Sequence, residues 1–132
     1  MELILMVGIA GSGKTTIAKR WFPKHVKISL DGMPKSNRKT EHDLIKQHLD
    51  DGDNVIVDDT NLTKTIRSAH IELAKKYRAR ITAIFLDLPM WKIQEQNSKR
   101  EKQVPESALF KMRKQLETPM EIEGIDFIQT IK

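Results

Sequence analysis

Eight consecutive residues near the amino end, 8–15, have the types and spacing needed to hold phosphate. They read Gly-Ile-Ala-Gly-Ser-Gly-Lys-Thr and match the pattern G-x-x-x-x-G-K-[ST]. The glycines let successive backbone N–H groups turn toward one point, where they surround phosphate oxygens. We expect Lys14 to add positive charge for the β- and γ-phosphates, and the Thr15 hydroxyl to hold Mg²⁺. The chemistry indicated is the binding of a nucleoside triphosphate.

The segments on either side of this loop favour the same interpretation. Residues 3–7 form an apolar run that suits a buried strand, and residues 16–22 have the pattern of a helix. A helix that starts within the loop directs its positive end at the bound phosphate. The alternative is a glycine-rich turn with an incidental lysine. The residues expected to bind ATP are Gly11, Ser12, Gly13, Lys14, Thr15 and Thr16.

Length and composition predict one folded domain, 1–132. The chain has 132 residues and no cysteine, which excludes disulfides and thiol chemistry and fits a reducing, cytoplasmic compartment. The formal net charge of +5 favours polyanionic partners such as nucleic acid. The first apolar run follows Glu2 and is expected to be a strand, not a signal peptide. Nothing approaches the length of a membrane span, so we expect no membrane partner.

Strand and helix patterns alternate along the chain, which predicts an α/β domain with a largely parallel sheet of about five strands. The expected strands cover 3–7, 25–30, 55–57, 81–86 and 125–131. The expected helices cover 16–22, 38–49, 63–77 and a segment that follows Pro105, with a polar, basic stretch from Pro89 to about Lys102. Trp21 is expected in the core, and the inward face of the 63–77 helix is expected to carry Ile66, Ala69, Leu73, Ala74 and Tyr77.

A second acidic site follows the apolar run 55–57. A carboxylate at the end of such a strand can face the Mg²⁺ beside a phosphate loop. Asp58 has the better position for the metal side, and Asp59 and Thr60 are then expected to point toward the mouth of the cleft. The alternative is that residues 59–61 cap the helix that begins near Thr63. Both interpretations can hold at once.

Missing motifs and one further carboxylate favour a phosphotransferase. The chain lacks the Asn-Lys-x-Asp motif with which GTP-binding proteins recognise guanine. Its strand-end pair is Asp-Asp, so the glutamate that activates water in motor-type ATPases is also missing. Asp31 directly follows the second expected strand, where a carboxylate can orient an acceptor hydroxyl and accept its proton. The alternative is a turn aspartate before Gly32.

The basic stretch 98–102 suits the second task of a kinase, which is to exclude water from the reaction. It reads Ser-Lys-Arg-Glu-Lys and could close over the phosphates as part of a lid near residues 89–104. Arg100 would then be a further ATP-binding residue and stabilise charge on the transferring group. The alternative is a solvated basic face.

Taken together, these segments resemble the 5′-hydroxyl polynucleotide kinase branch of the P-loop kinases. The likeness runs from Gly-Ser-Gly-Lys-Thr through Asp31, Asp-Thr-Asn-Leu at 59–62 and Asn-Ser-Lys-Arg at 97–100 to Val104-Pro105. It implies a three-layer, adenylate-kinase-like P-loop NTPase fold with ATP and Mg²⁺ as cofactors. The implied reaction is phosphorylation of a 5′-hydroxyl end of DNA or RNA.

The resemblance also implies roles for individual residues. It makes Asp31 the general base, Arg100 the lid arginine, and Asp59 and Thr60 part of the acceptor side. Arg67 aligns with a basic family position that could touch the acceptor backbone.

This sequence departs from the family at two positions. Pro34 stands where phage-type relatives have an acceptor-binding arginine, and Lys35 and Arg38 are the candidates to replace it. Gln96 stands where members of that family often have an arginine, one residue before Asn97.

The sequence is compatible with three functions. The first is a polynucleotide kinase active in nucleic-acid repair, with a separate phosphatase or ligase as partner. The second is a kinase for a small metabolite or nucleoside. The third is a non-catalytic nucleotide-binding regulatory module.

Overall fold

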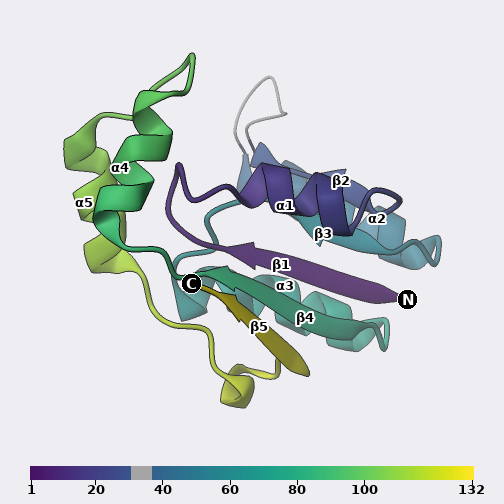
Figure 1. Cartoon of the computed structure of the whole chain (residues 1–132). Coiled ribbons are helices and arrows are strands. Elements are labelled where there is room, and N and C mark those ends of the chain that lie inside the picture. The colour runs from purple at the N-terminus through teal and green to yellow at the C-terminus, as the bar shows by residue number, and fades with distance from the viewer. Residues whose placement is uncertain (31–36) are drawn as a thin grey trace.

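The chain folds around a five-stranded sheet in which every strand pairing is parallel. The computed structural model describes residues 1–30 and 37–132. The strand order is β2-β3-β1-β4-β5, so β1 lies at the centre (Figure 1). Leu5 of β1 aligns with Val57 of β3 on one side and with Ala83 of β4 on the other. The strands are β1 (Glu2–Val7), β2 (Val26–Ile28), β3 (Val55–Val57), β4 (Arg80–Leu86) and β5 (Phe127–Ile131).

Helices cover both faces of the sheet, which gives the three layers expected from the sequence. They are α1 (Lys14–Trp21), α2 (Arg38–Asp50), α3 (Lys64–Lys76), α4 (Met90–Ser98) and α5 (Glu106–Gln115), with a short 3-10 turn, η2 (Glu121–Glu123). Because side chains alternate along a strand, Leu3 and Leu5 share a core cluster with α2 and α3. Ile4 and Met6 point the other way and pack with α1. The predicted fold class is confirmed.

A third apolar cluster places α4 and α5 at the edge of the sheet where its parallel strands end. It joins residues that follow β1, β3 and β4 to the two helices: Ile9, Leu62, Leu88, Ile93 and Leu109. Figure 1 shows α4 and α5 together beside the connection from β1 to α1. The sheet thus presents the phosphate loop, and the third cluster holds α4 against it.

Two sequence predictions about packing are wrong. Trp21, expected in the core, is 43% exposed because it ends α1 at the surface. Ala69, expected on the inward face of α3, is exposed. The buried face of α3 instead includes Arg67 and His70, two polar residues that a search for apolar periodicity passes over.

Across the part of the chain that the structure describes, no helix combines the length and the apolar character needed to cross a membrane.

Candidate active site

The glycine-rich loop between β1 and α1 has the backbone conformation that its sequence predicts. Gly11 has φ +83° and Gly13, the residue that caps α1, has φ +93°. Side chains rarely adopt this left-handed region, so glycine is required at both positions. α1 begins at Lys14, two residues earlier than expected, and directs its N-terminus at the loop. The Lys14 ammonium group donates to the Ile9 carbonyl oxygen, 3.0 Å away across the loop.

The end of β3 places a carboxylate beside the loop. The Thr15 hydroxyl donates to Asp58 Oδ2 at 2.9 Å, and the Lys27 ammonium lies 3.8 Å from the same oxygen. Asp58 Oδ1 is buried, and no described residue hydrogen-bonds to it. A buried carboxylate oxygen beside a hydroxyl oxygen is a donor set that suits Mg²⁺. Thr15 and Asp58 are therefore the residues that would hold this ion.

Backbone and side-chain bonds fasten the segment after β3 to the start of the phosphate loop. The Gly8 N–H donates to the Thr60 carbonyl at 3.1 Å. Asn61 is buried with φ +46°, and its amide donates to the Met6 carbonyl at 2.7 Å. The cap of α3 is Thr63, whose hydroxyl accepts from the Ile66 N–H at 3.2 Å. The alternative that residues 59–61 cap this helix is therefore wrong.

A cavity of about 670 Å³ lies over these elements. Its lining includes the loop residues expected to bind ATP, namely Gly11, Ser12, Gly13, Lys14, Thr15 and Thr16. Asp58, Asp59 and Thr60 line it after β3, and Arg100 lines it from the segment after α4. The structure thus brings together all but three of the predicted site residues. Asp31 and Lys35 lie outside the described residues, as does the departure at Pro34, and Arg67 does not line the cavity.

Asp59 occupies an unusual electrostatic position at this cavity. Its carboxylate accepts from the Leu30 N–H at 2.8 Å and lies 3.9 Å from the Arg38 guanidinium. Burial and a hydrogen bond with the Glu41 carboxyl group raise the pKa of Asp59 to about 7. Nearby, burial lowers the pKa of His70 to about 4, and the Arg38 charge acts in the same direction. Near neutral pH, Asp59 can therefore act as either a donor or an acceptor.

Arg67 occupies a different place from the one its predicted role requires. Its side chain is 0% exposed. Its guanidinium makes a two-pronged contact with the Glu123 carboxylate, at 2.9 and 3.1 Å. It also donates to the carbonyls of Asn61 and Leu62, at 2.8 and 3.2 Å. A side chain engaged in this way and closed off from solvent cannot touch an acceptor backbone, so the structure corrects that prediction to a structural role.

Asn97 fixes the segment that carries Arg100. Its buried amide donates to the Val104 carbonyl at 2.7 Å, and its carbonyl accepts from the Val104 N–H at 2.9 Å. Both ends of the intervening loop are thereby held. Gly11 packs against the same helix, because a Cβ added there would lie 3.4 Å from both Asn97 Cβ and the Ile93 carbonyl oxygen. The loop that bears Arg100 is thus anchored next to the phosphate loop.

The sequence placed three further residues in the lid segment 89–104 without assigning any of them to the site. Lys92, Gln96 and Lys99 line the cavity together with Arg100. Their spacing of four and three residues places them on one helical face. That spacing could have identified them as a group. Arg38, considered only as a possible substitute for a missing arginine, also lines the cavity.

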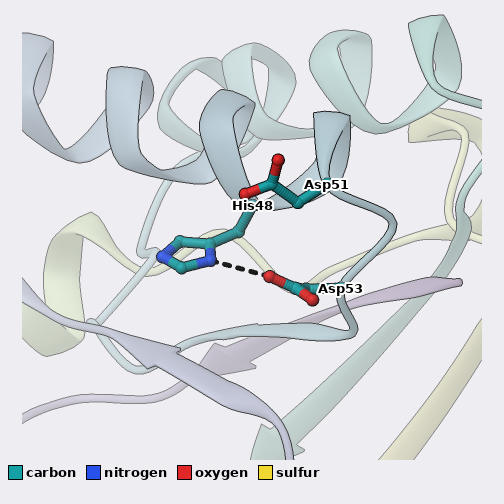
Figure 2. A group of neighbouring side chains, drawn as sticks. All are labelled: His48, Asp51 and Asp53. Atoms are coloured by element: carbon teal, nitrogen blue, oxygen red, sulfur yellow. Dashed lines mark hydrogen bonds and ion pairs between the residues drawn. The ribbon is translucent and has the colours of Figure 1, made fainter.

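A second polar group lies at the opposite end of α2 from the cavity (Figure 2). The possible ligand atoms of His48, Asp51 and Asp53 lie within 4.8 Å of one another. Within this group the His48 ring and an Asp53 carboxylate oxygen already form a hydrogen bond, 2.9 Å long. α2 begins at the cavity with Arg38 and ends at Asp50, so this group is separate from the candidate active site.

Comparison with known proteins identifies the family. A model described as an AAA domain matches residues 3–119, a span that runs from β1 past α5. The chain belongs to this AAA domain family.

One curated relative and three solved structures extend the comparison. L-seryl-tRNA(Sec) kinase from Methanococcus maripaludis is 24% identical over 135 residues, which cover 89% of this chain and 53% of that protein. The chain thus spans about half the length of this relative.

The solved structures share the fold at low sequence identity. Kti12 from Chaetomium thermophilum, in complex with ADP-AlF3, has a TM-score of 0.72 at 19% identity, covering 98% of this chain and 88% of its own. A sugar kinase from Janibacter sp. HTCC2649 also has a TM-score of 0.72, at 21% identity, covering 98% and 85%. A fungal RNA kinase has 0.71 at 19% identity, covering 99% and 74%. The chain therefore has the P-loop kinase fold, in keeping with its nucleotide-binding loop.

Proposed function

We propose that this AAA domain protein transfers the γ-phosphoryl group of ATP to the 5′-hydroxyl end of DNA or RNA. The observation that carries the proposal is a cavity lined together by the phosphate loop, the polar residues after β3, and the basic residues of α4. Transfer is in line, and most of the acceleration comes from positioning and charge neutralisation.

In this proposal the residues divide into a phosphate side and an acceptor side. The loop amides and Lys14 hold the β- and γ-phosphates, and Arg100 stabilises charge on the transferring group from the lid segment 89–104. Thr15 and Asp58 would hold Mg²⁺, which supplies charge neutralisation when bound.

The acceptor side in this proposal consists of residues that follow β2 and β3 in the sequence. Asp31 accepts the proton of the attacking hydroxyl, and Lys35 lies close to it in sequence. Asp59 and Thr60 contact the acceptor from the segment after β3.

The charge of the cavity supports a polyanionic acceptor. Basic side chains outnumber acidic ones among its described lining residues, where Asp58 and Asp59 are the acids. A positive cleft attracts nucleic acid and accelerates encounter with it. The basic lining residues are Lys14, Arg38, Lys92, Lys99, Arg100 and Lys132.

A kinase for a small metabolite or nucleoside is the second candidate. Its support is that a sugar kinase shares this fold as closely as the RNA kinase does, with TM-scores of 0.72 and 0.71. Such an enzyme would share every residue on the phosphate side, so only the acceptor distinguishes the two functions.

One labelling experiment separates these functions. The protein is incubated with γ-labelled ATP and Mg²⁺ in parallel with 5′-hydroxyl DNA, 5′-hydroxyl RNA, nucleosides and sugars. Label on oligonucleotide ends is expected. Label confined to a small molecule would favour the second candidate, and tight ATP binding without transfer would favour a regulatory module.

Two variants test the assignment of the base. Asp31→Asn is expected to lower turnover roughly 100-fold or more while leaving ATP affinity nearly unchanged. Asp43→Asn is the matched control, because Asp43 lies exposed on α2. Full activity in Asp31→Asn would refute the role of Asp31 as general base.

A further inference from the structure

A fully buried carboxylate interacts with two residues that line the cavity. Glu41, in the first turn of α2, is 0% exposed where α2 packs on α3. Its Oε1 accepts from Arg38 Nη1 at 3.0 Å and lies 3.5 Å from His70 Nε2. A buried carboxylate is unfavourable unless it is paired and hydrogen-bonded. The packing of two helices does not require one, so its position needs another explanation.

The groups around Glu41 connect it to the cavity. Arg38 and Asp59 both line the cavity, and both interact with Glu41, Arg38 through its guanidinium and Asp59 through its carboxyl group. His70 faces Glu41 from α3, but burial keeps its ring neutral near pH 7 because the pKa is lowered to about 4. Arg38 is therefore the cation that balances this buried charge among the described residues packed around it.

The same contact restricts the position of Arg38. Its side chain is 48% exposed and comes from the first residue of α2, where a long side chain would otherwise sample many rotamers. The bond to Glu41 uses an N–H group of Nη1, and a guanidinium carries five such donors. The guanidinium is thus held at the wall of the cavity, where it can meet an anion.

We propose that Glu41 is a positioning residue that holds the Arg38 guanidinium toward an anionic group of the acceptor. This inference rests on the proposed polynucleotide kinase function, because it takes that group to be a backbone phosphate next to the reacting hydroxyl. Arginine suits this task since its planar donors match phosphate oxygens. An orientation fixed before binding improves affinity because less freedom is lost on binding.

The test compares steady-state kinetics of Arg38→Ala, Glu41→Ala, Glu41→Gln and the double alanine variant with the unmodified protein. The KM for a 5′-hydroxyl oligonucleotide and the KM for ATP are measured separately. Each single alanine variant is expected to raise the oligonucleotide KM about 10- to 100-fold, the size of a lost charge-assisted contact, and to change the KM for ATP less than about twofold.

Three comparisons sharpen the result. The double variant should match Arg38→Ala within about twofold, because Glu41 acts through Arg38. Glu41→Gln keeps an oxygen that can accept from Arg38 and should fall between the unmodified protein and Glu41→Ala. Lys39→Ala is the matched control for net charge, since Lys39 is the next residue on α2 and its side chain is 87% exposed. Its oligonucleotide KM should stay within about threefold.

Several outcomes would overturn the inference. Equal increases in both KM values in Glu41→Ala would indicate a general structural role. If the increase in oligonucleotide KM in the double variant equals the product of the increases in the two single variants, Glu41 does not act through Arg38. If Glu41→Ala does not fold, Glu41→Gln tests the inference instead, because glutamine has the same shape as glutamate. An oligonucleotide KM in Glu41→Gln as high as in Arg38→Ala would refute positioning by the retained oxygen.

The same experiment separates this inference from the proposed function. No oligonucleotide label from the unmodified protein would reject the proposed function, and this inference with it. Label from the unmodified protein with an unchanged oligonucleotide KM in Arg38→Ala would reject this inference alone.

Discussion

Replacing Arg67 with methionine tests the structural role that the fold assigns to this residue. The substitution removes the two-pronged contact with Glu123 and both hydrogen bonds to the carbonyls after β3. It leaves the Glu123 carboxylate, whose side chain is 7% exposed, without its cation. Breaking a buried ion pair by removing one partner destabilises a protein by about 3–5 kcal/mol.

The size of the chain converts this loss into a melting temperature. The unfolding entropy for 132 residues is about 0.28 kcal/mol/K. Arg67→Met should therefore lower the Tm by roughly 11–18 °C. Thermal unfolding followed by circular dichroism or calorimetry measures the shift.

Two further variants complete the test. Lys76→Met removes a charge from the exposed end of the same helix and should leave the Tm within about 1–2 °C, as surface substitutions usually do. Adding Glu123→Gln to Arg67→Met should recover part of the loss, because the unpaired charge is then removed. A nearly unchanged Tm together with a raised acceptor KM would refute the reasoning and restore Arg67 as an acceptor contact.

The remaining predictions concern the metal, the segment after α4 and pH. Thr15→Ala should require about tenfold more Mg²⁺ for half-maximal activity, whereas Thr15→Ser, which keeps the hydroxyl, should titrate like the unmodified protein. Asn97→Ala leaves the N–H and the carbonyl of Val104 without partners, each costing about 1–3 kcal/mol if it stays buried. Faster proteolysis within residues 99–103 and a lower kcat are therefore expected. In Asp59→Asn only the His70 shift remains, so the Tm should rise with pH between pH 4 and 6.5. In His70→Asn only the Asp59 shift remains, so the Tm should fall between pH 4 and 7.

The opposite signs of the two pH slopes follow from proton counts. The pKa of Asp59 is about 7 in the folded protein and ordinarily 3.8, so between these values the folded state binds more protons than the unfolded state. Its contribution to stability is thus present near pH 4 and lost by pH 7. The pKa of His70 is about 4 instead of 6.5, so the folded state binds fewer protons and stability is lost as the pH falls. Slopes of equal sign in the two variants would contradict this account.

Local features of the chain were predictable because neighbouring residues determine them. The phosphate loop follows from glycines that tolerate positive φ, and the strands follow from short apolar runs between polar segments. The sequence also assigned Thr15 and Asp58 to the same metal, although they lie 43 residues apart, because a carboxylate at the end of a parallel strand can face the phosphate loop; their direct hydrogen bond is seen only in the structure.

Features that depend on distant partners could not be predicted in the same way. The sequence around Arg67 gives no sign that it is buried, because its partner Glu123 lies 56 residues later in the chain. Glu41 shares a helical face with Ile45 and Leu49, yet only the packing of α2 on α3 shows that this face is closed to solvent at Glu41. Tertiary contacts, not helical periodicity, decide the environment of such side chains.

The packing of α4 on the phosphate loop has a consequence for how substitutions spread through the site. Ile9 of the loop and Ile93 of α4 share one buried apolar cluster. Asn97, one turn further along α4, hydrogen-bonds both backbone groups of Val104, beyond the turn that carries Arg100. Because buried side chains are close-packed, a substitution that changes the volume at Ile93 is expected to shift the phosphate loop and the Arg100 turn together.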